Sequence, residues 1–126
     1  MVDFREYAHD DGALIRLIGG IATSAEWARE MELPIVRHPG ARFFLAVEDD
    51  ECVGILAVHR RKQRHGWVRP DRRGRGLYTA LRTWALARIK GRLSTATRSP
   101  AVAHLCRKGG FIEMGARGGV TIWRRA

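Results

Sequence analysis

The chain has 126 residues, of which 45% are apolar and 29% charged, a balance that supports one core and excludes a disordered chain. No run approaches the ~20 apolar residues of a membrane helix, and Cys52 and Cys106 show no spacing typical of a disulfide framework or a metal site. The first residues lack the features of a secretory signal, so we expect one soluble cytoplasmic domain over 1–126, as a monomer or homodimer.

Charge is divided unevenly along the chain, whose net charge is +10. Residues 1–51 hold 11 acidic and 5 basic side chains, whereas residues 52–126 hold 2 acidic and 18 basic ones. The basic C-terminal half indicates a polyanionic partner such as a nucleic acid. The alternative is a bias of genome composition, because Arg outnumbers Lys 20 to 3.

The N-terminal third is predicted to hold a strand and helices. A strand is expected at 2–7, and Asp10-Asp11 can cap a helix whose apolar residues repeat at helical spacing over 14–21. A second helical piece is expected within 23–32, before Pro34.

Two apolar runs at 42–47 and 52–58 flank an acidic turn and predict a hairpin in a sheet covered on both faces. Later elements are expected as a strand at 65–68, a helix from Gly76 to Ile89, a strand at 93–97, a helix from Pro100 to Gly109, and a hairpin of 111–114 and 120–124. The first of these helices has Arg82 off its apolar stripe. The predicted class is α/β (α+β), a mixed central sheet flanked by helices.

The segment from Val68 to Tyr78 joins a strand end to a helix through a turn with two glycines. Backbone amides at a helix N-terminus suit a pyrophosphate, and Gly74 and Gly76 would let it approach the backbone closely. Arg73 and Arg75 add positive charge nearby. By itself a Gly-x-Gly turn is weak evidence for a phosphate site, because a structural loop uses the same residues.

Two motifs in this order resemble the GCN5-related N-acetyltransferase (GNAT) family. Arg73-Gly74-Arg75-Gly76-Leu77-Tyr78 resembles its coenzyme A signature Gln/Arg-x-x-Gly-x-Gly/Ala, which follows a strand ending Val-x-Pro, as in Val68-Arg69-Pro70. Residues 99–111 resemble Asn-Pro-x-Ala-x-x-Leu-Tyr-x-Lys-x-Gly-Phe and align at Pro100, Leu105, Lys108, Gly110 and Phe111. The resemblance spans nearly the whole chain and implies one GNAT-like domain with a splayed strand before the pyrophosphate loop.

This resemblance implies an N-acyltransferase that moves an acetyl or other acyl group from acyl-coenzyme A to an amine by direct attack. Tyr78 departs from the small residue of the signature, and Ser99 replaces an asparagine that contacts pantetheine. The residues expected to bind the cofactor are Val68, Arg69, Arg73, Gly74, Arg75, Gly76, Leu77, Tyr78 and Ser99.

Aminolysis of a thioester needs a neutral amine and a proton for the departing thiolate. Cys106 replaces the family tyrosine that often acts as general acid, and a thiol with a pKa of about 8.5 could serve instead. In the alternative interpretation Cys106 is a buried filler and water supplies the proton. No glutamate lies between Cys52 and Asp71, so His65 is the nearest candidate base and His59 the next, although each is also typical of a surface histidine.

The acceptor is either a nucleic acid base or a small amine or protein N-terminus. A basic and aromatic cluster where phosphates and a splayed base could dock consists of Arg60, Arg61, Lys62, Arg64 and Trp67. The alternative from another class of function is a catalytically idle domain that binds nucleic acid or another polyanion through the same face.

Overall fold

The computed structural model describes residues 1–22, 24–25, 29 and 38–126, so most of the helical piece expected within 23–32 lies outside the described residues. The described elements are β1 (Asp3–Ala8), α1 (Gly12–Ala22), β2 (Arg42–Glu48), β3 (Glu51–His59), β4 (Lys62–Val68), the 3-10 turn η1 (Pro70–Arg72), α3 (Leu77–Arg88), β5 (Leu93–Thr97), α4 (Pro100–Lys108), β6 (Ile112–Arg117) and β7 (Val120–Arg125). Each other predicted strand and helix is present, and the fourth strand begins three residues earlier than predicted, at Lys62.

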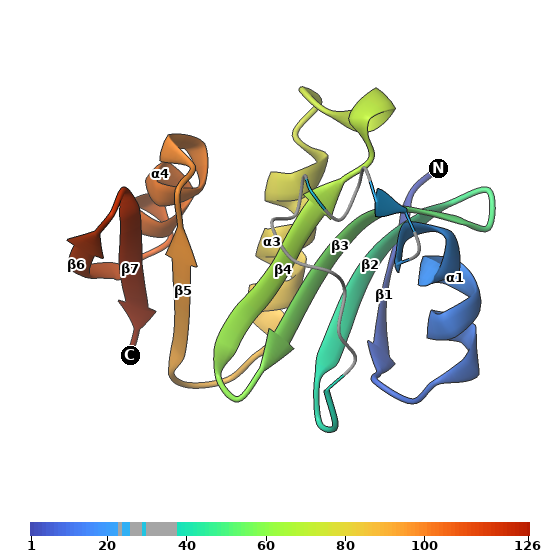
Figure 1. Ribbon diagram of the computed structural model, residues 1–126, viewed down its shortest axis with the longest axis horizontal. Helices are drawn as coiled ribbons and strands as arrows, with labels where there is room; N and C mark the ends of the chain where they lie inside the picture. The colour runs from blue at the N-terminus through green and yellow to red at the C-terminus, as the bar shows by residue number, and fades with distance from the viewer. Residues whose placement is uncertain (23, 26–28, 30–37) are drawn as a thin grey trace.

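The described strands form one mixed sheet in the order β1-β2-β3-β4-β5-β7-β6. Neighbouring strands are antiparallel except β4 and β5, which run parallel and pair only where Lys62 faces Ser94. Figure 1 shows these two strands diverging beyond that point, with α1 on one face of the sheet and α3 and α4 on the other. The predicted class and the predicted splay of the fourth strand are therefore confirmed.

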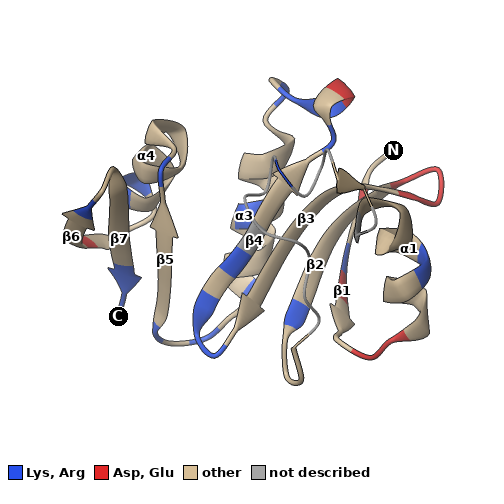
Figure 2. Cartoon of the chain, in the orientation of Figure 1, with Lys and Arg blue, Asp and Glu red and all other residues tan. Residues whose placement is uncertain are grey.

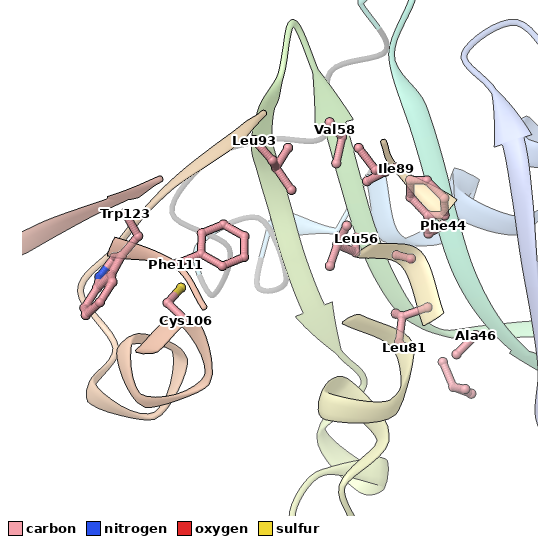
Figure 3. Packing of buried hydrophobic residues seen from close by; sticks show 12 residues of the cluster. Phe44, Ala46, Leu56, Val58, Leu81, Ile89, Leu93, Cys106, Phe111 and Trp123 are labelled. Atoms are coloured by element: carbon pink, nitrogen blue, oxygen red, sulfur yellow. The ribbon is translucent and has the colours of Figure 1, made fainter. Parts of the chain in front are cut away.

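The middle of the sheet is buried on both faces, as the apolar runs predicted. Side chains alternate between faces along a strand, so Phe43 joins a cluster on the α1 side whereas Phe44 joins the cluster under α3 and α4. Figure 3 shows the second cluster, in which Phe44 and Leu81 lie on one side and Cys106 on the other. No helix in the described ranges is long and apolar enough to cross a membrane.

A β-bulge explains where β4 leaves β5. Ala57 pairs with His65 and Val58 with Gln63, so Arg64 is an extra residue on β4. A bulge bends and twists its strand, and this one lies two residues after Lys62, where β4 pairs with β5. The local backbone thus turns the rest of β4 away from its neighbour.

Two sequence-based placements are wrong. Arg82 was placed off the apolar stripe of α3, on the side expected to face solvent. It is only 5% exposed, because α3 is covered by α4 as well as by the sheet. Trp67 was placed in an exposed cluster for docking a base, but it is only 4% exposed and packs with Ile55 in the cluster on the α1 side. It therefore has no free ring face for stacking.

Candidate functional site

The loop after β4 presents backbone amides at the start of α3. Gly74 and Gly76 have φ of 78° and 77°, a region that favours glycine, and no atom lies within 4 Å of a Cβ built on either. Gly76 is the N-cap residue, and no side chain caps the helix. The amides of residues 77–79 precede the first helical donor, Ala80, whose N–H bonds to the carbonyl of Gly76 at 3.0 Å. These amides and the open space before them suit a pyrophosphate.

The free edge of β4 lies beside this loop. The amide of Arg69 bonds to the carbonyl of Val53 in β3 at 2.9 Å, so the neighbouring peptide groups of Val68 point to the opposite edge, which β5 leaves unpaired. The Nε atom of Arg73 donates to the carbonyl of Val68 at 2.9 Å. The side chain of Arg73 is therefore folded back onto the strand end, although Arg73, like Arg75, is exposed.

The side chain of Arg69 serves a structural role. It donates to Glu51 at 2.8 Å and to Asp71 at 2.7 Å, and this guanidinium lowers the pKa of Asp71. Arg72 in the same turn is paired with Glu48. These pairs hold the segment after β4 against the β2–β3 turn. The contribution of Arg69 to cofactor binding, predicted from the sequence, would have to come from its backbone.

Tyr78 reaches from α3 over β4. Its hydroxyl accepts a hydrogen bond of 2.8 Å from Nε2 of Gln63, and burial raises its pKa. A Cβ built on Gly66 would lie 2.6 Å from this hydroxyl. The tyrosine side chain therefore packs so closely on β4 that only glycine fits at position 66. The side-chain oxygen of Gln63 is buried without a described partner. The tyrosine thus occupies space beside the free edge of β4 that a small residue would leave open.

Cys106 and Arg82 meet between the two helices. Cys106 is fully buried, and its Sγ accepts a hydrogen bond of 3.3 Å from Nη2 of Arg82. Burial raises the pKa of the thiol, and the nearby guanidinium lowers it by a smaller amount. Arg82 also lines a hollow of about 380 Å³ that runs between α3 and α4 and starts at Thr79 in the first turn of α3.

Ser99 performs the capping role predicted for it. Its Oγ accepts from the amide of Val102 at 3.3 Å, and Pro100 occupies the first turn of α4. A contact of Ser99 with a cofactor stays a prediction.

The comparisons with known proteins agree with this geometry. The model of the acetyltransferase (GNAT) family matches residues 7–111, which include the loop and all of α4. The chain belongs to the GNAT family. No curated protein matches the chain.

Solved GNAT structures share the fold at low sequence identity. An acyl-CoA N-acyltransferase from Pseudomonas aeruginosa superposes with a TM-score of 0.74 at 16% identity, and Escherichia coli ElaA with 0.76 at 13%, each over 100% of both chains. A GNAT family acetyltransferase from Elizabethkingia anophelis, solved with acetyl-CoA bound, gives 0.64 at 12% identity over 98% of this chain and 96% of its own. At this level of identity the comparison shows that the chain shares the fold of these proteins.

The predicted GNAT residues fall into two groups in space. Residues 68–78 lie at the end of β4 and in the first turn of α3, whereas Ser99 caps α4 and Cys106 lies within α4. The backbone of His65 pairs with Ala57 beside the bulge, and its side chain is not among those described. His59 stacks on His38 with ring centres 4.7 Å apart, and burial lowers its pKa.

Sequence reasoning missed Gln63 and Arg82. Arg82 lies four residues after Tyr78 and three before Ala85, which is the spacing of one helix face, so its burial had a signal in the sequence. The pairing of Gln63 with Tyr78 had none, because it depends on the bulge and on the packing of α3 over β4.

Proposed function

We propose that the chain transfers an acetyl or other acyl group from acyl-coenzyme A to an amine by direct attack. The observation that carries this is the combination of a β4 edge left open by its single pair with β5 and uncapped amides at the start of α3. The amides of residues 77–79, with Arg75 exposed beside them, would hold the pyrophosphate. The amide of Val68 and the peptide groups of Gly66, on the edge of β4 that β5 leaves open, would bind the amide arm. The carbonyl of Val68 would have to give up its bond from Arg73 to take part. The bound cofactor supplies the thioester.

Proton transfer falls to a small set of residues. Because burial raises its pKa, Cys106 keeps its proton at neutral pH, as a donor to a departing thiolate must. Arg82, 3.3 Å from Sγ, favours the thiolate left after that transfer. His65 is our candidate for accepting the proton of the attacking amine, directly or through water.

The acceptor is an amine, either of a small molecule or protein N-terminus or of a nucleic acid base. The second candidate function is a domain that binds acyl-coenzyme A or a polyanion without turnover. It is favoured by the complete burial of Cys106 and by the absence of glutamate between Cys52 and Asp71.

Two measurements separate these functions. Stabilisation against heat by acetyl-coenzyme A reports on the cofactor site, and release of free coenzyme A thiol in the presence of small amines or oligonucleotides reports on transfer. We expect both. Stabilisation without acceptor-dependent release would favour the idle domain, and no stabilisation by any acyl-coenzyme A would overturn the proposed site.

A further inference from the structure

Six cationic side chains gather at the end of β4 opposite the phosphate-binding loop. We call them the basic surface; its members are Arg60, Arg61, Lys62, Lys90, Arg92 and Arg124. They line two hollows of about 410 and 210 Å³ that share Arg60 and Arg61. Arg42 and Arg88 also line the larger hollow, but both are paired with Glu6. No acidic residue is found among the described residues lining either hollow. Figure 2 shows this positive charge at the β3–β4 turn and along the segment leading into β5.

Hydrogen bonds tie the three segments of the basic surface together. The guanidinium of Arg61 donates to the carbonyls of Lys90 and Arg92, and the amide of Ser94 donates to the carbonyl of Arg61 at 2.9 Å. Arg125 donates to the carbonyl of Gly91 at 2.8 Å, which fixes the end of β7 beside the same loop. The cations are thus held close together by the fold.

This arrangement is unfavourable for the isolated protein. Like charges repel, and Arg60 and Arg61 have φ of 52° and 64°, which a two-residue hairpin turn usually assigns to asparagine and glycine. The β2–β3 turn, with the same need, uses Asp49 and Asp50, a residue type that tolerates this region better. Retaining two arginines at strained positions beside four other cations indicates that a negatively charged partner relieves the repulsion.

The phosphates of coenzyme A cannot be that partner. Lys62 and Val68 are the two ends of β4, so the basic surface lies about 20 Å along the strand from the phosphate-binding loop. A lipid surface is also disfavoured, since the described exposed large apolar side chains, Met1, Ile15, Ile112, Met114 and Ile122, do not line the hollows.

We propose that the basic surface binds the phosphodiester backbone of nucleic acid. Arginine forks match phosphate oxygens, and cations on three segments can contact more than one phosphate. Because Trp67 is buried, we infer contact through phosphates and no stacking of bases on that ring.

The basic surface also borders the opening between β4 and β5. Lys62 and Ser94, the single pair between these strands, both line the smaller hollow. A nucleic acid strand bound at the smaller hollow would present its bases to the opening between β4 and β5, which starts just after Lys62. This acceptor role rests on the proposed acyl transfer, whereas the binding itself does not.

The test is fluorescence anisotropy of labelled DNA and RNA, single-stranded and duplex, at several salt concentrations. The variant is Arg60→Gln/Arg92→Gln, which spares the structural hydrogen bonds of Arg61. The matched control is Arg16→Gln/Arg117→Gln, which removes the same charge from exposed sites on α1 and β6. Each lost phosphate contact lowers the slope of log affinity against log salt by about 0.7 to 0.9, so the first variant should lower it by about 1.5.

The control should keep the slope of the unchanged protein. An unaltered slope in Arg60→Gln/Arg92→Gln, an equal loss in the control, or binding to anionic vesicles with none to nucleic acid would each overturn the proposal. Stabilisation by acetyl-coenzyme A is measured on the same proteins. If that stabilisation is absent from all of them while nucleic acid binding depends on the basic surface, the acyltransferase fails and this inference stands.

Discussion

The Nη2 atom of Arg82 lies 3.3 Å from Sγ of Cys106, inside the core between α3 and α4. The guanidinium also lies over the ring of Phe111, 5.1 Å from its centre. No carboxylate of the described residues pairs with Arg82, and its Nε has no described partner. A buried cation thus faces the thiol that we propose as the proton donor.

Removing this cation should raise the pKa of Cys106. Burial raises that pKa, whereas the positive charge of Arg82 lowers it. In Arg82→Met the lowering effect is lost and only the raising effect of burial remains. The measurement is thiolate absorbance against pH. It uses a Cys52→Ala background, because burial raises the pKa of the Cys52 thiol to about 12 and its ionisation would overlap with that of Cys106. If the rise in absorbance from Cys106 stays at the same pH or moves to lower pH in Arg82→Met, the coupling between Arg82 and Cys106 is contradicted. The rise that is absent from Cys106→Ala is the one that belongs to Cys106.

Replacing Cys106 tests its role as proton donor. Cys106→Ala should lower kcat by about 100-fold, the usual contribution of a general acid, with KM little changed. Cys106→Ser should retain part of the activity, because a hydroxyl can still donate. A fall of less than about threefold for the alanine variant would make Cys106 a filler of the core, and thermal melting of both variants checks that they fold.

Gly76→Val should abolish binding of acetyl-coenzyme A. At φ of 77° a side chain costs about 1–2 kcal/mol, and its Cβ projects into the open space before the amides of α3. Gly118→Val is the matched control, since Gly118 has φ of 60° in the β6–β7 turn and also has no atom within 4 Å of a built Cβ. Calorimetry should show loss of binding in the first variant alone; equal affinity in both would refute the loop assignment.

Gly66 and Tyr78 should be energetically coupled. Gly66→Ala puts a methyl group 2.6 Å from the Tyr78 hydroxyl and should cost about 1–3 kcal/mol of unfolding free energy. Tyr78→Phe removes the hydroxyl and its bond to Gln63, at a cost of about 1 kcal/mol. In a double-mutant cycle by urea denaturation, Gly66→Ala should cost less in the phenylalanine background, and additive effects would disprove the contact.

Stability should depend on the ionisation of Glu6. Hydrogen bonds from Arg42, then from Arg88, lower its pKa below the ordinary 4.5. A carboxylate whose pKa is lower in the folded protein stabilises the fold at pH values above its pKa in the unfolded chain. This stabilisation is lost as the pH falls through the pKa of the folded protein. Glu6→Gln should therefore be less stable than the unchanged protein at pH 7 and converge with it in acid. The midpoints of urea denaturation of the two proteins, measured at several pH values, test this prediction. A difference in midpoint that is the same at every pH would contradict it.

Strands and motifs were predictable because their signals are local. The apolar runs around Phe44 and Leu56 indicated a sheet covered on both faces, and the structure confirms both clusters. Ser99 followed by proline predicted a capped helix, which is present. The two motifs predicted the family, which the match over residues 7–111 confirms. Each of these depends on neighbours in the sequence.

Tertiary structure decided the contacts between segments far apart in the chain. Trp67 and Arg82 were predicted to be accessible, but packing of α1 and α4 against the sheet buries them. The side chains of Arg69 and Arg73 are engaged by nearby carboxylates and a strand carbonyl, which the spacing of the motif did not reveal. The sequence determined which residues stand in the loop and on the helices, because propensity and periodicity act over a few residues. Which of them are exposed to a ligand was decided only by folding, because burial depends on what packs against each face.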